Sequence, residues 1–188
     1  QDEAYAADFI QRVQQVAATD VGRGGYGLTQ ETARWLALWM AFEDIPSVAQ
    51  LKCRPAREAE IREEVRAEPE QFIQVTEFFH PRVEEVAALL PQKWGERLLS
   101  SNLLSKLLQS MLGARKLRTD KVVTQWTMRR LAALKKRRRN SLGFSQEWAM
   151  IERWFSAVLA AQSYEIAKAI ADCGGMVKGY GATRHRTT

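Results

Sequence analysis

Residues 33–42 read ARWLALWMAF, and this stretch decides what kind of fold the sequence can adopt. Trp35, Trp39 and Phe42 fall on one side of a helix, and Leu36 falls on the neighbouring side. A helix that is apolar on nearly every side normally lies buried at the centre of its domain. We therefore expect a central core helix here, with its aromatic side chains packed inside.

The segment before this helix marks where the helix begins. Residues 20–28 read DVGRGGYGL, and four glycines within six positions break any preceding helix. Thr29 follows directly and is the residue that we predict as the N-cap, because its hydroxyl can accept a hydrogen bond from a free backbone N–H.

Helical spacing of apolar residues continues along the chain, and no convincing alternating run indicates a strand. We predict one all-α domain over residues 1–188, with orthogonal or bundle-like packing of several helices. Its main helices are expected over residues 2–19, 98–113, 120–136 and 145–173. The last of these would be roughly 43 Å long and would end at Gly174 and Gly175.

The composition excludes several classes of site. The 188 residues are 46% hydrophobic and 27% charged, as is typical of a globular domain. Two cysteines, Cys53 and Cys173, and two histidines, His80 and His185, occur. Because zinc and iron–sulfur centres need several such ligands, we expect no metal and no cofactor within this chain. The isolated cysteines favour a cytoplasmic location, and no stretch has the roughly 18 apolar residues of a membrane span.

The first residues suggest a piece of a longer protein. They read QDEAYAADF, without the basic start and apolar core of a signal peptide and without an initiator methionine. We therefore expect an excised domain or a processed product.

Cations concentrate in one part of the chain. The net charge is +6, yet residues 115–139 contain eleven Lys or Arg residues and a single acid, Asp120. Five cations follow one another at the end of this segment: Lys135, Lys136, Arg137, Arg138 and Arg139. Three roles stay open for them: a solvated helix end, a docking site for an acidic partner protein, and a nucleic-acid contact. No aromatic residue interleaves the run, which argues against binding of single strands by stacking.

Arg130 falls between Trp126 and Leu134 on the predicted apolar stripe of the helix over residues 120–136. A cation there either extends its charged end to the rim of the core or pairs with a buried carboxylate. We favour the first interpretation.

Glu77 and His80, in the stretch TEFFHPR, are the weak candidates for an acid–base pair. A lone histidine before proline more often ends a structural element. No nucleophile, nucleotide loop or metal cluster accompanies the pair, so a self-contained enzyme is the weakest interpretation of the chain.

Residues 174–188 form a glycine-rich tail that reads GGMVKGYGATRHRTT. Glycine lets backbone N–H groups approach an anion, but a phosphate loop follows a strand and precedes a helix. Here a helix precedes the glycines and the sequence then ends, so we predict a helix-terminating turn that anchors the tail. The predicted contact residues of the tail are Lys178, Gly179, Tyr180, Gly181 and Arg184.

Four stretches, in this order, resemble the C-terminal part of the beta-subunit family of indolepyruvate ferredoxin oxidoreductases. They are LTQETARWLALWMAFEDIPSVAQLKCR, VTEFFHPRVEEVAALLP, IERW and VKGYGATRHR. The similarity extends over nearly all 188 residues but covers only the helical C-terminal region of that family. Its preceding α/β domain, shared with the gamma component of pyruvate oxidoreductases, is absent here. Ala182 departs from the family pattern, in which an acid follows KGYG and precedes the threonine that is Thr183 here.

The resemblance implies a parent complex that oxidatively decarboxylates an aryl 2-oxoacid such as indolepyruvate to its acyl-CoA. Such a complex uses thiamine diphosphate and passes electrons through iron–sulfur clusters to ferredoxin. Its cofactor ligands lie mainly in other parts, so none is assigned to a position here. We expect a non-catalytic accessory domain that packs against the catalytic domain of the same subunit and a thiamine-binding alpha subunit. The alternative is a helical nucleic-acid-binding module that uses the basic segment 115–139.

Overall fold

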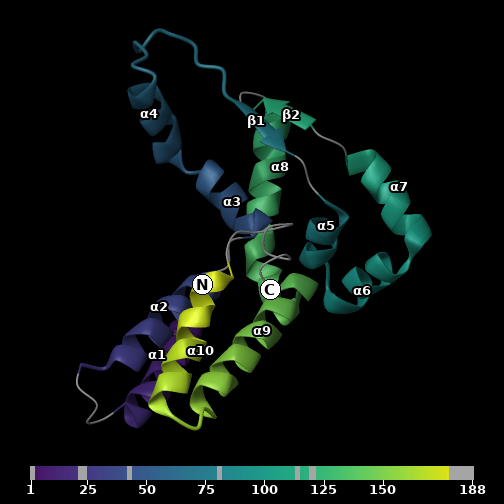
Figure 1. Ribbon diagram of the computed structural model, residues 1–188. Coiled ribbons are helices and arrows are strands. Elements are labelled where there is room, and N and C mark those ends of the chain that lie inside the picture. The colour runs from purple at the N-terminus through teal and green to yellow at the C-terminus, as the bar shows by residue number, and fades with distance from the viewer. Residues whose placement is uncertain are drawn as a thin grey trace. The chain divides into compact units, whose positions relative to one another are not determined.

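Helices dominate the part of the chain that the computed structural model describes, which is residues 3–20, 25–41, 44–79, 82–112, 115–118 and 122–177. The described elements are helices and one pair of four-residue strands, so the predicted all-α class is confirmed (Figure 1). Contacts divide the chain into a first unit, Gln1–Phe42 with Gln146–Thr188, and a second unit, Glu43–Ser145. That the two units make one domain stays a prediction.

Helices that run side by side form the described part of the first unit (Figure 1). They are α1 (Glu3–Thr19), α2 (Gly27–Ala41), most of α9 (Leu142–Leu159) and α10 (Tyr164–Cys173), followed by the short 3-10 helix η2 (Gly174–Met176). Leu36 of α2 and Ile151 of α9 are fully buried in its core.

Trp39 of α2 joins three elements of the first unit. Its side chain is 5% exposed, and its ring centroid lies 5.1 Å from that of Trp154 in α9. Its indole Nε1 donates a 3.0 Å hydrogen bond to the backbone oxygen of Gly174. Met40 is also buried, so the prediction of a central helix over this stretch is confirmed, while Phe42 lies outside the described residues.

The first turn of α2 is held by a residue that the sequence interpretation overlooked. The helix begins at Gly27, so Thr29 lies inside it and the N-cap prediction was wrong. Instead, Oδ2 of the buried Asp20 accepts hydrogen bonds from Thr29 N at 2.9 Å and from Thr29 Oγ1 at 2.8 Å. A carboxylate at this place satisfies a free N–H and offsets the positive end of the helix dipole.

The single long helix predicted over residues 145–173 was wrong, because α9 ends at Leu159 and α10 begins at Tyr164. Ser163 caps the second helix: its backbone is extended, and its hydroxyl accepts a hydrogen bond from Ile166 N. The cap starts a new helix at Tyr164, and this helix buries Ala167 and Ala171.

The second unit contains shorter elements. They are α3 (Ile45–Lys52), α4 (Pro55–Glu64), β1 (Thr76–Phe79), α5 (Val83–Leu89), α6 (Gln92–Ser100), α7 (Asn102–Leu112), β2 (Arg115–Arg118), α8 (Val122–Ala133) and the 3-10 helix η1 (Leu134–Asn140). The two strands pair antiparallel, with Thr76 opposite Arg118 and Phe79 opposite Arg115. Four-residue strands are too short for an alternating pattern to stand out in the sequence, which is why they were missed.

Helix α8 turns a different side inward from the one predicted. It packs against α3 and buries Thr124 and Met128, whereas Val123 is 75% and Trp126 59% exposed. The apolar stripe assigned from the sequence is therefore on the outside. The helix predicted over residues 120–136 also ends earlier, at Ala133, where η1 takes over.

Candidate functional site

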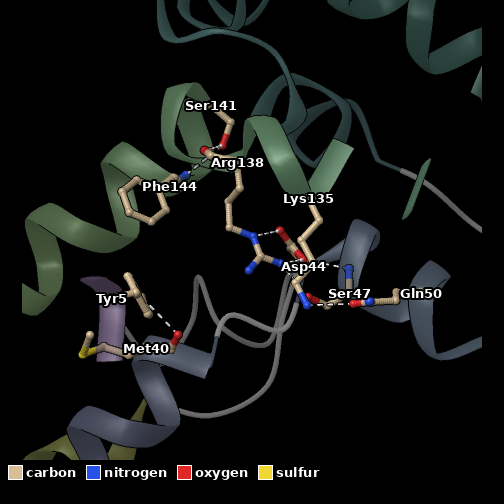
Figure 2. A network of polar contacts seen from close by, with 9 residues as sticks. All are labelled: Tyr5, Met40, Asp44, Ser47, Gln50, Lys135, Arg138, Ser141 and Phe144. Atoms are coloured by element: carbon tan, nitrogen blue, oxygen red, sulfur yellow. Dashed lines mark hydrogen bonds and ion pairs between the residues drawn. The ribbon is translucent and has the colours of Figure 1, made fainter. Parts of the chain in front are cut away.

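The predicted docking run lies in η1, and its cations differ in their surroundings. Arg138 is only 7% exposed, and its guanidinium forms a two-pronged ion pair with Asp44, with Nε 2.8 Å from Oδ2 (Figure 2). Nη2 of Arg138 also donates to the hydroxyl of Ser47. This arginine is therefore occupied inside the second unit and does not offer its charge to an outside partner.

Asp44 contacts both α3 and η1. It is the N-cap of α3, where its Oδ1 accepts a 2.9 Å hydrogen bond from Ser47 N. The same carboxylate receives the guanidinium of Arg138, so one side chain starts α3 and ties η1 to it. Bidentate pairing of this kind fixes geometry as well as adding energy.

The remaining cations of the run leave a smaller basic surface. Lys135 donates a 2.7 Å hydrogen bond from Nζ to Oε1 of Gln50 in α3. Lys136, Arg137 and Arg139 are exposed. We define these three residues as the basic segment of η1, and a docking role for them stays a prediction.

Among the described residues, Arg130 pairs with no buried carboxylate. It is exposed on α8, and its guanidinium carbon lies 4.8 Å from the ring centroid of Trp126. The cation thus covers an exposed aromatic ring, which is a cation–π contact worth about 0.5–1 kcal/mol at such sites.

Helix α7 carries an apolar side that its own unit does not cover. Leu103 is 80%, Leu104 47% and Leu107 58% exposed. No residue of this eleven-residue helix is buried. The sequence showed the leucines but not which of them the unit covers. The prediction of one helix over residues 98–113 missed the break at Ser101, which separates α6 from α7.

A polar hollow lies in the first unit around Arg12. Its guanidinium forms a bidentate ion pair with Glu152, at 2.6 and 3.2 Å, and Nε donates to Asp8 at 3.1 Å. The guanidinium carbon lies 5.0 Å from the ring centroid of Trp148 and 5.2 Å from that of Phe155. The hollow has a volume of about 340 Å³. Only the Asp8–Arg12 spacing of four could have been read from the sequence.

The charges of this hollow stabilise one another. Burial lowers the pKa of Arg12, but its hydrogen bonds to Glu152 and Asp8 and the negative charges of these two side chains together raise the pKa overall. The hydrogen bond from Arg12 lowers the pKa of Glu152 below its ordinary value of 4.5. With its cation already paired to two carboxylates, the site is a structural clamp rather than an open anion receptor.

Acid should weaken the first unit through this clamp. Because the folded-state pKa of Glu152 is lowered, the pair stabilises the fold above about pH 4.5 and loses its contribution as the pH falls through the folded value. Glu152→Gln should therefore flatten the pH dependence of the urea midpoint below about pH 5. We expect an effect of at most about 1 kcal/mol, since the Glu152 side chain is 43% exposed. An unchanged pH profile in the variant would contradict this assignment.

The structure describes only some of the other predicted site residues. The backbone of Glu77 pairs with Leu117 in the two-stranded sheet, and His80 lies outside the described residues. The tail residues Lys178, Gly179, Tyr180, Gly181 and Arg184 also lie outside them. Cys53 and Cys173 are free thiols.

The described part of the chain lacks two kinds of feature. It contains no group of three or more His, Cys, Asp or Glu side chains that could hold a metal ion. Within the same residues, no helix combines the length and apolar character that crossing a membrane requires.

Comparison with known proteins places the chain in a family. A search of the curated proteins and a search of the solved structures each found no similar protein. A comparison with models of protein families found one whose match extends over residues 1–188. Since that match spans the whole sequence, the chain belongs to this family, which is described as a family of unknown function (DUF6537).

Proposed function

We propose that the chain is an accessory, scaffolding part of a 2-oxoacid ferredoxin oxidoreductase subunit of the indolepyruvate type. The exposed leucines of α7 are the observation that carries the proposal, because a group of exposed apolar side chains on one helix marks an interaction surface. The four stretches that resemble the indolepyruvate family supply the identity of the assembly.

In this proposal the chemistry of the complex lies in other parts. Thiamine diphosphate and iron–sulfur clusters supply decarboxylation and electron transfer when they are bound there. The residues of this chain do not fit a cluster of the four-thiolate type, since the sequence has two cysteines. The chain's own contribution is to pack against the catalytic domain of the same subunit and the thiamine-binding alpha subunit.

The basic segment of η1 has a place in this scheme. Lys136, Arg137 and Arg139 are exposed, and they follow helix α8, whose Arg129 and Arg130 are also exposed. Such a surface suits an acidic partner, and the ferredoxin itself is the partner that we propose for it. Charge complementarity of this kind raises the association rate more than the final affinity.

The proposal is tested with the complete gene product. We expect the full-length protein, purified with its associated subunits, to reduce ferredoxin in the presence of indolepyruvate, and residues 1–188 alone to be inactive. Replacing Lys136, Arg137 and Arg139 with Gln should slow ferredoxin reduction at low salt and leave the rate at high salt unchanged. Turnover by the isolated 188 residues, or a full-length protein without 2-oxoacid activity, would refute the proposal.

A nucleic-acid-binding module remains the alternative because the same three cations are exposed. Phosphate contacts release counterions, so binding to duplex or single-stranded DNA would be strongest at low salt. Absence of binding at about 50 mM salt would exclude this alternative.

A further inference from the structure

The exposed side of α7 is apolar, as is typical of a surface that another molecule covers. Leu103 and Leu107 are one helical turn apart, and Leu104 lies beside them, all three exposed. Leu108 and Leu112 lie further round the same apolar half of the helix and are half-buried, and α7 contacts α5 and α6. One part of this apolar half is therefore covered by the second unit, and the part with Leu103, Leu104 and Leu107 is exposed.

The charged residues of α6 and α7 are mainly positive. Lys106 is the single charged residue of α7, and on the helical wheel it borders Leu103. The neighbouring helix α6 carries exposed Lys93 and Arg97 against one exposed acid, Glu96. The two helices thus combine exposed apolar side chains with a net charge of +2.

We propose that α6 and α7 form a docking surface for a partner protein whose own surface is apolar at the centre and acidic at its rim. An amphipathic helix with leucines flanked by glutamates has this chemistry. The proposal rests on the proposed function, since it names the kind of surface that covers α7 within the larger assembly.

Two other occupants fit the charges and the packing less well. A second copy of this chain would bring two cationic rims together, and like charges at an interface are unfavourable. A helix that lies on a membrane keeps its other face polar and rich in Lys and Arg. In α7 the polar face carries a single cation, Lys106, among Asn, Ser and Gln side chains.

The test uses the 188-residue chain and a fluorescent peptide of about 14 residues, designed as a helix with leucines on one side and glutamates at both borders. The matched peptide has lysines in place of the glutamates. Fluorescence anisotropy should show binding of the glutamate peptide, at least tenfold weaker binding of the lysine peptide, and weakening of the former with salt.

Two double variants separate the surface from general effects. Leu103→Ser/Leu107→Ser should weaken peptide binding at least tenfold, because two apolar anchors are lost. Val65→Ser/Phe72→Ser is the control, since these side chains of the second unit are 58% and 80% exposed, the same fractions as Leu107 and Leu103. The control should bind the peptide like the original chain.

Every other outcome overturns the proposal. It fails if neither peptide binds at about 100 μM, if both bind alike, or if the leucine variant binds unchanged. Self-association of the chain that the leucine variant abolishes would assign the surface to a second copy. Binding to vesicles of anionic lipid that the same variant abolishes would assign it to a membrane. Ferredoxin reduction by the full-length complex does not depend on the peptide, so a failure here is distinguishable from failure of the proposed function.

Discussion

Replacing Asp44 with alanine is expected to lower the free energy of unfolding of the second unit by about 3–5 kcal/mol. The substitution leaves the guanidinium of Arg138 buried, at 7% exposure, without the carboxylate that pairs with it, while its hydrogen bond to the hydroxyl of Ser47 stays. It also removes the N-cap of α3, which contributes about 0.5–2 kcal/mol on its own. Both losses act on the contact between α3 and η1.

Removing Arg138 instead of Asp44 should lower the free energy of unfolding by a smaller amount. Arg138→Met leaves Asp44, whose side chain is 27% exposed and still caps α3 through Ser47 N. We expect about 1–3 kcal/mol, so the two single variants should differ although they break the same ion pair. The double variant Asp44→Ala/Arg138→Met should be less destabilised than the sum of the single ones, because no buried charge is left.

Urea unfolding of the full chain gives the free energies, and hydrogen exchange of the α3 amides assigns the loss to the second unit. Lys136→Met is the control, because it removes an exposed cation from the same 3-10 helix. Equal losses for Asp44→Ala and Lys136→Met would show that the ion pair contributes nothing beyond surface charge.

The sequence predicted the helical class and the central helix because both depend on local patterns. Leu36 and Trp39 are three positions apart, so they lie on the same side of a helix, and both are buried. This spacing can be recognised without knowing which elements pack against the helix. The end of α10 at Cys173, before two glycines, was visible for the same reason. Gly175 shows a further constraint, since a Cβ there would lie 2.5 Å from Trp35. That constraint depends on packing and cannot be read locally.

Contacts between residues far apart in the chain could not be predicted from the sequence. Arg138 stood among five equivalent cations, and only its contact with Asp44, 94 residues away, separates it from the others. The clamp between Arg12 and Glu152 spans 140 residues. The break between α9 and α10 was hidden because apolar residues continue through it at helical spacing, and Ser163 as a cap is one serine among several.

Trp39→Ala should lower the free energy of unfolding of the first unit by about 3–5 kcal/mol, as expected for a buried tryptophan replaced by alanine. The substitution removes the ring that packs on Trp154 and leaves a cavity between α2 and α9. It also leaves the backbone oxygen of Gly174 without its hydrogen-bond donor, at the point where α10 passes into η2.

Two further variants divide this loss into its parts. Trp39→Phe keeps an aromatic ring but removes the Nε1 donor, so it should cost about 1–3 kcal/mol, the range for a buried acceptor left unsatisfied. Leu38→Ala, one residue away but 47% exposed, should cost less than about 1 kcal/mol. Urea unfolding gives all three values, and hydrogen exchange of the α2 amides places them in the first unit. If Leu38→Ala costs as much as Trp39→Ala, α2 is not the core helix of its unit, since a core helix must distinguish its buried side from its exposed one.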